Sequence, residues 1–303
     1  MEPMAHGDSR IDRMGYTRPT TRSAAMGVGR ATRAGAPKWI VYALLWAFAL
    51  AIIYPLFWMV TSSLKTNAEL FDNTWALPQD PQWSNWTQAW DLGVGRFILN
   101  SVIVTGSSIV GVIVVGAWAA YALARFHFPA KNVVFLLIIG GMMLAPQVAL
   151  IPLFQLLRAM RIYNTYGGLI VLDVAFRIPF TVFLMRAYMV GLPHEVEESA
   201  YMDGATHWQI FWRIVLPLSK PILVSAALLQ ALFSWNEFLF ALTFIQDQAL
   251  KTLPVGLLDM QSRVLTNWPV LLAGLSIAAL PMMALFISAQ GRFVRGLAEG
   301  WGK

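Results

Sequence analysis

Long stretches without charge are the feature that most limits how this chain can fold. Four intervals of 26 to 28 residues contain no Asp, Glu, Lys or Arg: residues 39–64, 97–124, 132–157 and 264–291. A helix needs roughly 20 apolar residues to cross the hydrocarbon core of a membrane. Each interval is therefore long enough for one membrane-spanning helix.

Two further spans are predicted although charges interrupt them. One covers about residues 168–190 and contains Asp173 and Arg177, and the other covers about residues 219–244 and contains Glu237. The composition agrees, because 13% of the residues are charged, whereas soluble domains usually carry about 25%. The predicted fold is an all-α membrane protein with six transmembrane helices. Prolines within the spans are expected to kink them: Pro55, Pro146, Pro152, Pro179 and Pro281.

The distribution of Lys and Arg predicts the topology. If the N-terminus is cytoplasmic, the inside segments hold 15 of these residues and the outside segments hold six, while Arg177 lies within a span. The positive-inside rule then places both termini in the cytoplasm. A nucleic-acid-binding protein would gather its basic residues on one solvated face, so the net charge of +6 does not indicate one.

The first 37 residues are polar and rich in Gly, Arg and Thr. They contain no apolar segment of the kind that a signal peptide needs. Residues 1–37 are therefore predicted to form a disordered basic cytoplasmic tail, and residues 38–303 a single transmembrane domain.

A polar stretch between the fourth and fifth spans carries strong helix signals. Pro193 can open a helix, and three glutamates follow in its first turns, where the helix dipole favours negative charge: Glu195, Glu197 and Glu198. Gly204 is the residue best suited to end this helix with a left-handed cap. A short acidic helix is therefore expected before Gly204.

A second helix is predicted to begin directly afterwards. Thr206 and Gln209 have the spacing of a capping box. Four apolar residues then recur at helical spacing and predict one apolar stripe: Trp208, Phe211, Trp212 and Val215. Leu216-Pro217 ends the pattern. The two helices together predict a helix-turn-helix on the cytoplasmic side, within about residues 191–220.

Two interpretations of this helix-turn-helix compete. It could rest on lipid as an interfacial amphipathic helix, or it could dock a protein partner. The three glutamates of the first helix would be repelled by an anionic inner leaflet. The acidic helix therefore favours a protein partner with a basic or amphipathic cleft.

The same stretch resembles a known motif. The run from Glu198 to Gly204, followed by nine residues and then Ile214-Val215-Leu216-Pro217, is similar to the EAA loop of ABC-importer permeases, E-A-A-x3-G-x9-I-x-L-P. Ser199 departs from the pattern, where alanine is usual. The resemblance implies that this loop forms the coupling helix that seats in a cleft of the ATP-binding subunit. The residues implied at that joint are Glu198, Ala200, Asp203, Gly204, Ile214, Leu216 and Pro217.

Shorter motifs extend the resemblance over most of the chain. They are similar to the carbohydrate-uptake branch, and most similar to the six-span member of the maltose-type permease pair: Asn100-Ser101, Ala120 to Arg125, Ile151-Pro152-Leu153, Trp235 to Phe238, Thr252 to Leu257 and Arg295 to Gly300. The long basic N-terminal tail is not part of the family pattern.

The resemblance also implies partners. They are two copies of an ATP-binding subunit, a homologous second permease, an extracytoplasmic solute-binding protein and a carbohydrate or related polyol. In the family, the outside loop of about residues 247–268 contacts the binding protein, and the C-terminal residues 295–300 reach the ATPase dimer.

Charges within the spans are candidates for a translocation path. Asp173 and Arg177 are four residues apart, so they share a helix face and can pair. Glu237 is expected in the outer half of its span, and a charge in a membrane normally faces protein or water. Asn236, Glu237 and Arg177 therefore line a polar translocation cavity or, equally, form a structural network between helices.

Two other classes of function remain as alternatives. An ion-coupled secondary transporter would use intramembrane acids or histidines and would need no docking loop. A membrane enzyme has the least support, because the four histidines are scattered and no metal-ligand, nucleophile or phosphate-binding motif is present. No cofactor is expected, and the energy for transport would come from a separate ATPase.

Overall fold

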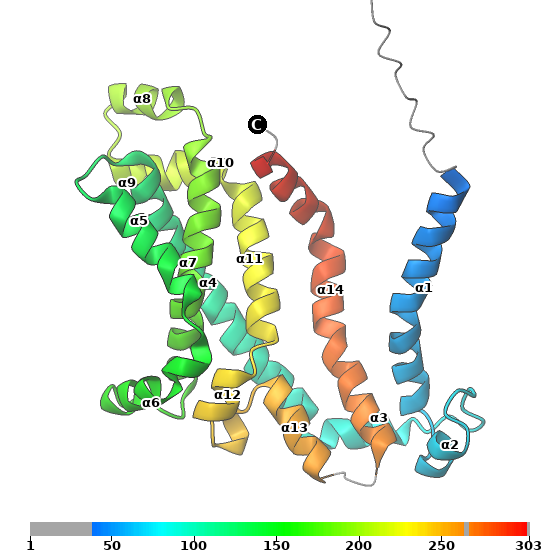
Figure 1. The fold of residues 1–303 in the computed structure, drawn as a ribbon. Helices are drawn as coiled ribbons and strands as arrows, with labels where there is room; N and C mark the ends of the chain where they lie inside the picture. Colours follow the sequence, from blue (N-terminus) through cyan, green and yellow to red (C-terminus); the bar gives the residue numbers. More distant parts are fainter. Residues whose placement is uncertain (1–37, 264–266, 302–303) are drawn as a thin grey trace, which may run out of the picture. The chain divides into compact units, whose positions relative to one another are not determined.

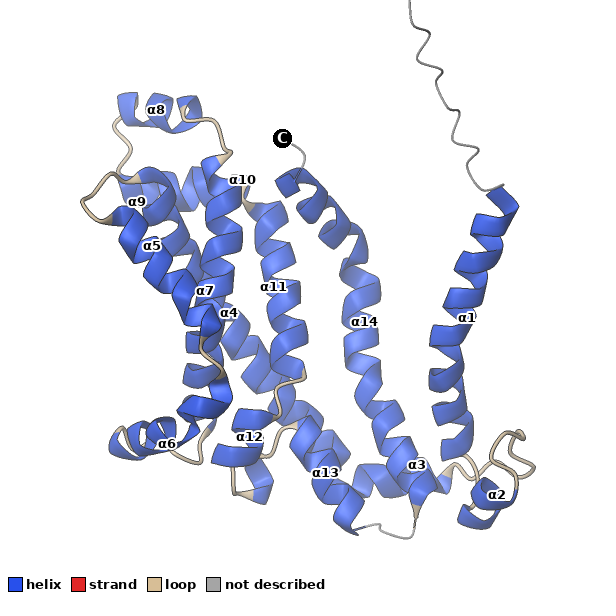
Figure 2. Cartoon of the chain, in the orientation of Figure 1, coloured by secondary structure: helices blue, strands red, loops and turns tan. Residues whose placement is uncertain are grey.

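The computed structural model describes residues 38–263 and 267–301, and every regular element within these ranges is a helix (Figures 1 and 2). The predicted disordered tail of residues 1–37 lies outside the described residues. Contacts divide the chain into two units, residues 1–50 and residues 51–303. In the smaller unit, the first half of α1 is a helix with exposed apolar side chains.

Helices of ordinary α geometry alternate with short 3₁₀ and π turns. The α-helices are α1 (Lys38–Ser63), α2 (Asn67–Asp72), α3 (Ser84–Ala89), α4 (Gly95–Arg125), α5 (Lys131–Gly140), α6 (Leu150–Ala159), α7 (Tyr166–Val190), α8 (Glu195–Met202), α9 (His207–Ile210), α10 (Leu216–Leu218), α11 (Lys220–Trp235), α12 (Leu239–Phe244), α13 (Leu253–Arg263) and α14 (Trp268–Trp301). The π turns are η1 (Trp90–Val94) and η4 (Phe211–Val215), and the 3₁₀ turns are η2 (Gly141–Met143), η3 (Pro146–Ala149) and η5 (Gln248–Leu250).

Four stretches of the described chain are long and apolar enough to cross a membrane, and the number rises to six if each of two bent helix pairs counts as one span. The four are Lys38–Ser63, Ser84–Arg125, Tyr166–Val190 and Trp268–Ala289. The bent pairs are Lys131–Met143 with Pro146–Ala159, at 90°, and His207–Leu218 with Lys220–Trp235, at 76°. The predicted all-α membrane fold is thus confirmed.

Two of the predicted spans are broken. The third bends after Met143, where Leu144 and Ala145 are extended, with ψ values of 115° and 123°. Pro146 accounts for this, since a proline disfavours helical geometry in the residue before it. The fifth was predicted to continue through about residue 244, but α11 ends at Trp235 and α12 begins only at Leu239.

Helices α4 and α7 pack closely through small residues. A Cβ atom at Gly111 would lie 2.8 Å from Val174 Cγ2, and one at Gly116 would lie 2.8 Å from Thr181 Cγ2. Small residues allow such close approach between helices in a membrane. Arg186 also donates a hydrogen bond from Nε to the carbonyl of Leu123, at 3.2 Å. Helices α4 and α7 therefore form one closely packed pair.

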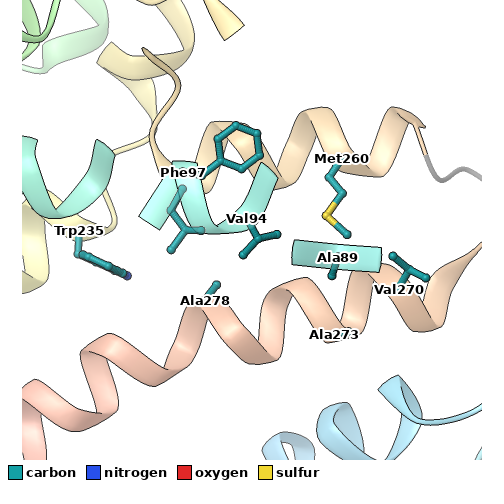
Figure 3. Packing of buried hydrophobic residues seen from close by; sticks show 9 residues of the cluster. Ala89, Val94, Phe97, Trp235, Met260, Val270, Ala273 and Ala278 are labelled. Atoms are coloured by element: carbon teal, nitrogen blue, oxygen red, sulfur yellow. The ribbon is translucent and has the colours of Figure 1, made fainter. Parts of the chain in front are cut away.

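A second packing region joins the start of α4 to α13 and α14. Figure 3 shows Val94 and Phe97 facing α13 and α14, with Met260 and Ala278 nearby, and these residues are buried. A Cβ atom at Gly256 would lie 2.3 Å from the Phe97 ring. The predicted outside loop, which contains α13, is thus packed on the helix bundle.

The ends of the larger unit differ in character. Helices α8, α9 and α10 lie at the same end as the C-terminal part of α14, whereas α6, α12 and α13 lie at the opposite end (Figure 1). This arrangement places the predicted helix-turn-helix and the predicted outside loop on opposite ends, as the topology requires.

Candidate functional site

The helix-turn-helix forms as predicted, and its turn depends on glycine. Helix α8 begins with its glutamates in the first turn and ends at Met202, with Asp203 as its C-cap, after which Gly204 adopts φ +81°. The N–H of Ala205 donates to the carbonyl of Ala200 at 3.0 Å, and the N–H of Gly204 donates to that of Tyr201 at 3.0 Å. These two bonds make a Schellman motif, in which glycine is usual because it adopts positive φ without strain.

The second helix begins with the predicted capping box. Thr206 Oγ1 accepts the backbone N–H of Gln209 at 3.3 Å, and Gln209 Oε1 accepts the backbone N–H of Thr206 at 2.8 Å. Helix α9 then passes through the π turn η4 into α10. We call α8, α9, η4 and α10 together the bracket.

The predicted apolar stripe of the bracket is only half buried. Phe211 and Val215 are buried, but the side chains of Trp208 and Trp212 are 58% and 40% exposed. Ile210, which was not in the predicted stripe, is buried instead. The predicted stripe is thus divided between buried residues and two partly exposed tryptophans.

The residues predicted at the ATPase joint divide into two groups. Glu198, Asp203, Gly204 and Pro217 are exposed, whereas Ala200, Ile214 and Leu216 are half-buried. A Cβ atom at Gly204 would meet nothing within 4 Å. Met202 beside it is 88% exposed. The turn of the bracket thus presents an open surface that includes an apolar side chain.

Aromatic stacking fixes the inner side of the bracket to α4. Trp118 stacks on Trp208 with ring centroids 4.5 Å apart, and Tyr121 lies 5.2 Å from Phe211. The buried residues Met185 and Met189 of α7 belong to the same cluster. The motif of residues 120–125 therefore contacts the bracket directly.

An ion pair that the sequence did not predict also joins α4 to the bracket. Arg125 Nε lies 2.6 Å from Glu197 Oε1, and the two side chains are only 5% and 8% exposed. Glu197 was interpreted only as a favourable charge at a helix N-terminus. No local spacing pairs two residues this far apart in the sequence, so no sequence signal could have found the contact.

A cavity of about 710 Å³ lies between the two broken spans. Its lining includes Gly141 to Gln147 at one break and Asn236 to Phe240 at the other, together with Phe176 and Arg177 of α7. All three residues predicted for a translocation path line this cavity: Arg177, Asn236 and Glu237. The helix breaks that hydropathy did not reveal thus form its walls.

The charged residues of the cavity also make structural bonds. Arg177 Nε pairs with Asp173 Oδ1 at 3.0 Å, as predicted, and Gln230 Nε2 donates to Asp173 Oδ2 at 3.3 Å. The Arg177 guanidinium also lies 4.8 Å from the centre of the Phe233 ring. Since Asp173 and Gln230 are buried, this network fastens α7 to α11.

Glu237 caps the helix that follows it. Its two carboxylate oxygens accept the backbone N–H groups of Phe240 at 2.7 Å and Ala241 at 3.0 Å. The neighbouring Asn236 donates from its side-chain amide to the carbonyl of Leu232 at 2.7 Å. These bonds end α11 and start α12, which explains why the fifth span breaks here.

Two of the short motifs meet at the opposite end of the molecule. Asn100 Nδ2 donates to the carbonyls of Ala249 at 2.9 Å and Lys251 at 2.8 Å, and its Oδ1 accepts from the Tyr166 hydroxyl at 2.7 Å. Ser101 Oγ accepts the N–H of Leu253 at 2.8 Å. These bonds anchor the start of the predicted outside loop to α4.

Asn164 anchors the same loop from another side and was missed. It has φ +56°, and its Oδ1 accepts the N–H groups of Gln246 at 2.8 Å and Asp247 at 3.0 Å. Asparagine is among the residues that tolerate positive φ. The short polar segment before Gly167-Gly168 was the only signal for such a turn.

Comparison with known proteins agrees with this geometry. Residues 112–298 match the family described as the binding-protein-dependent transport system inner membrane component. A probable ABC transporter permease protein of Bacillus subtilis, YurM, is 45% identical over 260 residues, which cover 86% of this chain and 87% of that protein. The melibiose/raffinose/stachyose import permease protein MelC of the same organism is 34% identical and covers 83% of this chain and 92% of its own length.

Other relatives and a solved structure extend the likeness. The diacetylchitobiose uptake system permease protein NgcG of Streptomyces coelicolor is 32% identical and covers 86% of this chain and 87% of its own length. The fold is similar to that of a bacterial ABC transporter involved in the import of the acidic polysaccharide alginate, with a TM-score of 0.73 at 24% identity over 84% of this chain and 96% of that one.

The apolar spans, together with the family match and the relatives, define an integral membrane protein of the kind that serves as the permease subunit of an ABC importer. The chain belongs to the family of binding-protein-dependent transport system inner membrane components. The alternative of an ion-coupled secondary transporter receives no support from these comparisons.

Proposed function

We propose that this permease forms half of the translocation path for a carbohydrate or related polyol. The observation that carries the proposal is its likeness, at 32% and 34% identity over more than four-fifths of the chain, to import permeases for diacetylchitobiose and for melibiose, raffinose and stachyose. A homologous second permease supplies the other half of the path. An extracytoplasmic solute-binding protein delivers the sugar.

The energy comes from two copies of a separate ATP-binding subunit, which agrees with a sequence that carries no phosphate-binding motif. The bracket is the element that meets that subunit. Its turn is exposed, the Cβ direction of Gly204 is open, and Met202 offers an apolar contact. Closure of the two ATPases would draw the brackets together and turn the cavity toward the outside.

The cavity between the broken spans serves as this chain's part of the path. Its volume of about 710 Å³ is in the range of about 300–1,000 Å³ that small-molecule sites occupy. Amide and carboxylate groups of Gln147, Asn236 and Glu237 suit sugar hydroxyls, and the Phe233 ring suits the apolar face of a pyranose. Mixed polar and aromatic walls fit a hydroxyl-rich solute.

The bracket end faces the cytoplasm in this proposal, and the outside loop with α13 faces the binding protein. The asymmetry of 15 inside to six outside Lys and Arg that the sequence predicts supports this orientation. Both termini are then cytoplasmic in a bacterial inner membrane.

The test is reconstitution of the permease with its partner permease, ATPase and binding protein in liposomes. The binding protein is first titrated with melibiose, raffinose, stachyose, diacetylchitobiose and alginate oligosaccharides, and the tightest ligand is used for uptake. Uptake should require ATP inside and binding protein outside, and it should persist when an ionophore collapses the ion gradient. If uptake stopped when the ion gradient was collapsed, although ATP was still present, the protein would instead be a secondary transporter.

A further inference from the structure

Helix α8 is attached to the rest of the chain mainly through charge. Among its eight residues, all of which are described, only Glu197 is buried. The following helix α9 and the π turn η4, by contrast, insert the buried side chains of Ile210, Phe211 and Val215 into the apolar cluster that they share with α4 and α7. The two halves of the bracket are therefore held by different kinds of interaction.

The partner of Glu197 is the last residue of α4. Arg125 Nε lies 2.6 Å from Glu197 Oε1, its Nη2 donates to the carbonyl of Leu192 at 3.0 Å, and its Nη1 lies 3.1 Å from His194 Nε2. One guanidinium thus contacts the chain before α8 and the first turn of α8. We call Arg125 and Glu197 the α4–α8 pair.

A buried ion pair of this kind contributes more to geometry than to stability. Removing two charges from water offsets much of their attraction, but the guanidinium also donates a directed hydrogen bond from Nη2 to the carbonyl of Leu192, two residues before the N-cap of α8. Among the apolar residues of α8, Ala200 is half-buried against the apolar cluster and the others are exposed, so the pair is the one fully enclosed contact that orients this helix. The pair therefore fixes the direction in which the exposed side of α8 points.

Helix α4 leads from this pair toward the cavity. It packs against α7 through Gly111 and Gly116, and α7 carries Arg177 in the cavity wall. A displacement of α8 that is passed to Arg125 would therefore move a closely packed helix pair rather than a single loose helix. The apolar contacts of α9 and η4 meet the same two helices, so the bracket reaches the cavity wall through α4 and α7.

From these contacts we infer that Arg125 and Glu197 are positioning residues that transmit the movement of α8 to the α4–α7 helix pair, and so set how much solute is carried for each ATP hydrolysed. The inference rests on the proposed function, because it requires α8 to meet an ATPase. It gives a role to two residues that belong neither to the exposed turn at Gly204, where the ATPase is proposed to bind, nor to the cavity lining.

The experiment uses the complete transporter in liposomes with Arg125→Gln, Glu197→Gln and the double variant. Three quantities are measured: the amount of ATPase that co-purifies, the rate of ATP hydrolysis stimulated by sugar-loaded binding protein, and the rate of sugar uptake. The sugar is the one that the binding protein binds most tightly in the titration described above. Both single variants should retain the ATPase, because the exposed turn at Gly204 is unchanged. Uptake per ATP should fall by about tenfold, which is within the usual range of coupling between sites.

The double variant tests whether the two residues act together. Its uptake per ATP should equal that of the worse single variant, since residues that act as one unit are not additive. Lys131→Gln is the matched control, because Lys131 begins the next helix and its Nζ contacts the carbonyl of Ala124 at 3.4 Å without reaching α8. The control should keep the wild-type ratio.

Three results would overturn the inference while leaving the proposed function intact. The first is wild-type uptake per ATP in both single variants. The second is a parallel fall in hydrolysis and uptake at constant ratio, which would make the pair merely structural. The third is a double variant whose loss equals the product of the two single losses. If wild type itself bound no ATPase, the proposed function would fail instead.

Discussion

The carboxylate of Glu237 accepts the backbone N–H of Phe240 at 2.7 Å, and thereby starts α12 after the break in the fifth span. The second oxygen accepts the N–H of Ala241. The same side chain lines the cavity. Glu237 therefore has a structural role and a place in the proposed path at once.

Glu237→Gln should separate these two roles. An amide offers one good acceptor oxygen where the carboxylate offers two, so one N–H of α12 loses a charge-assisted bond of about 1.5–3 kcal/mol. The thermal unfolding midpoint in detergent should fall by several degrees, and sugar uptake should fall as well. Thr243→Ala is the control, because its hydroxyl bonds only to the Leu239 carbonyl of its own helix. An unchanged midpoint in Glu237→Gln would contradict the capping role.

The second prediction concerns orientation. The asymmetry of 15 inside to six outside Lys and Arg predicts that a reporter fused after residue 303, or inserted within residues 191–220, reports cytoplasm. A reporter within residues 70–90 should report the outside. The measurement is the paired activity of reporters that function on only one side of the membrane. An outside-facing reporter at Ala205 would show that the bracket does not face an ATPase.

The third prediction concerns the outside loop. Leu258 is exposed on α13, whereas Met260 on the same helix is buried against the start of α4 and α14. The chain contains no cysteine, so a single introduced thiol reacts alone. Leu258→Cys should crosslink to the binding protein, and Met260→Cys should not. Equal crosslinking of both variants, or of neither, would remove α13 from the contact surface.

Local signals in the sequence predicted the bracket well. Gly204 and the pair of Thr206 and Gln209 act through bonds to residues three to five positions away, so their spacing is visible in the chain. The same holds for Asp173 and Arg177, which are one helical turn apart. The six spans were also visible, because hydropathy depends only on composition within a window, and four of them are unbroken helices.

Features that depend on distant contacts were not visible, and of the two backbone breaks only the one at Pro146 had a local signal, since a kink was expected at this proline. Hydropathy is as high on both sides of Pro146 and of Asn236, so it did not reveal that the chain bends there and forms a cavity. Arg125 and Glu197 come together only because α4 and the bracket pack against each other. Which residues of the predicted apolar stripe are buried likewise depends on contacts with α4 and α7.

The last prediction concerns Gly204, on which the coupling role of the bracket depends most. Its φ is +81°, and a side chain there would meet nothing within 4 Å in this chain. A substitution at this position can therefore act in two ways. It strains the backbone by about 1 kcal/mol or more, and its new side chain projects into the proposed ATPase cleft. Gly204→Asp should leave the spans inserted, weaken ATPase association and abolish uptake, and Glu198→Ala should give a milder defect.

Two further variants separate strain from obstruction. Asparagine tolerates positive φ better than alanine does, but it is larger. If obstruction dominates, Gly204→Asn should lose more ATPase than Gly204→Ala, and if strain dominates, the order should reverse. Co-purification of the ATPase and labelled-sugar uptake are compared in membranes with equal permease content. Because the packing of a docked cleft leaves little spare volume, we expect the asparagine variant to be the weaker binder. If Gly204→Asp kept both ATPase binding and uptake at the wild-type level, the bracket would not be the coupling element.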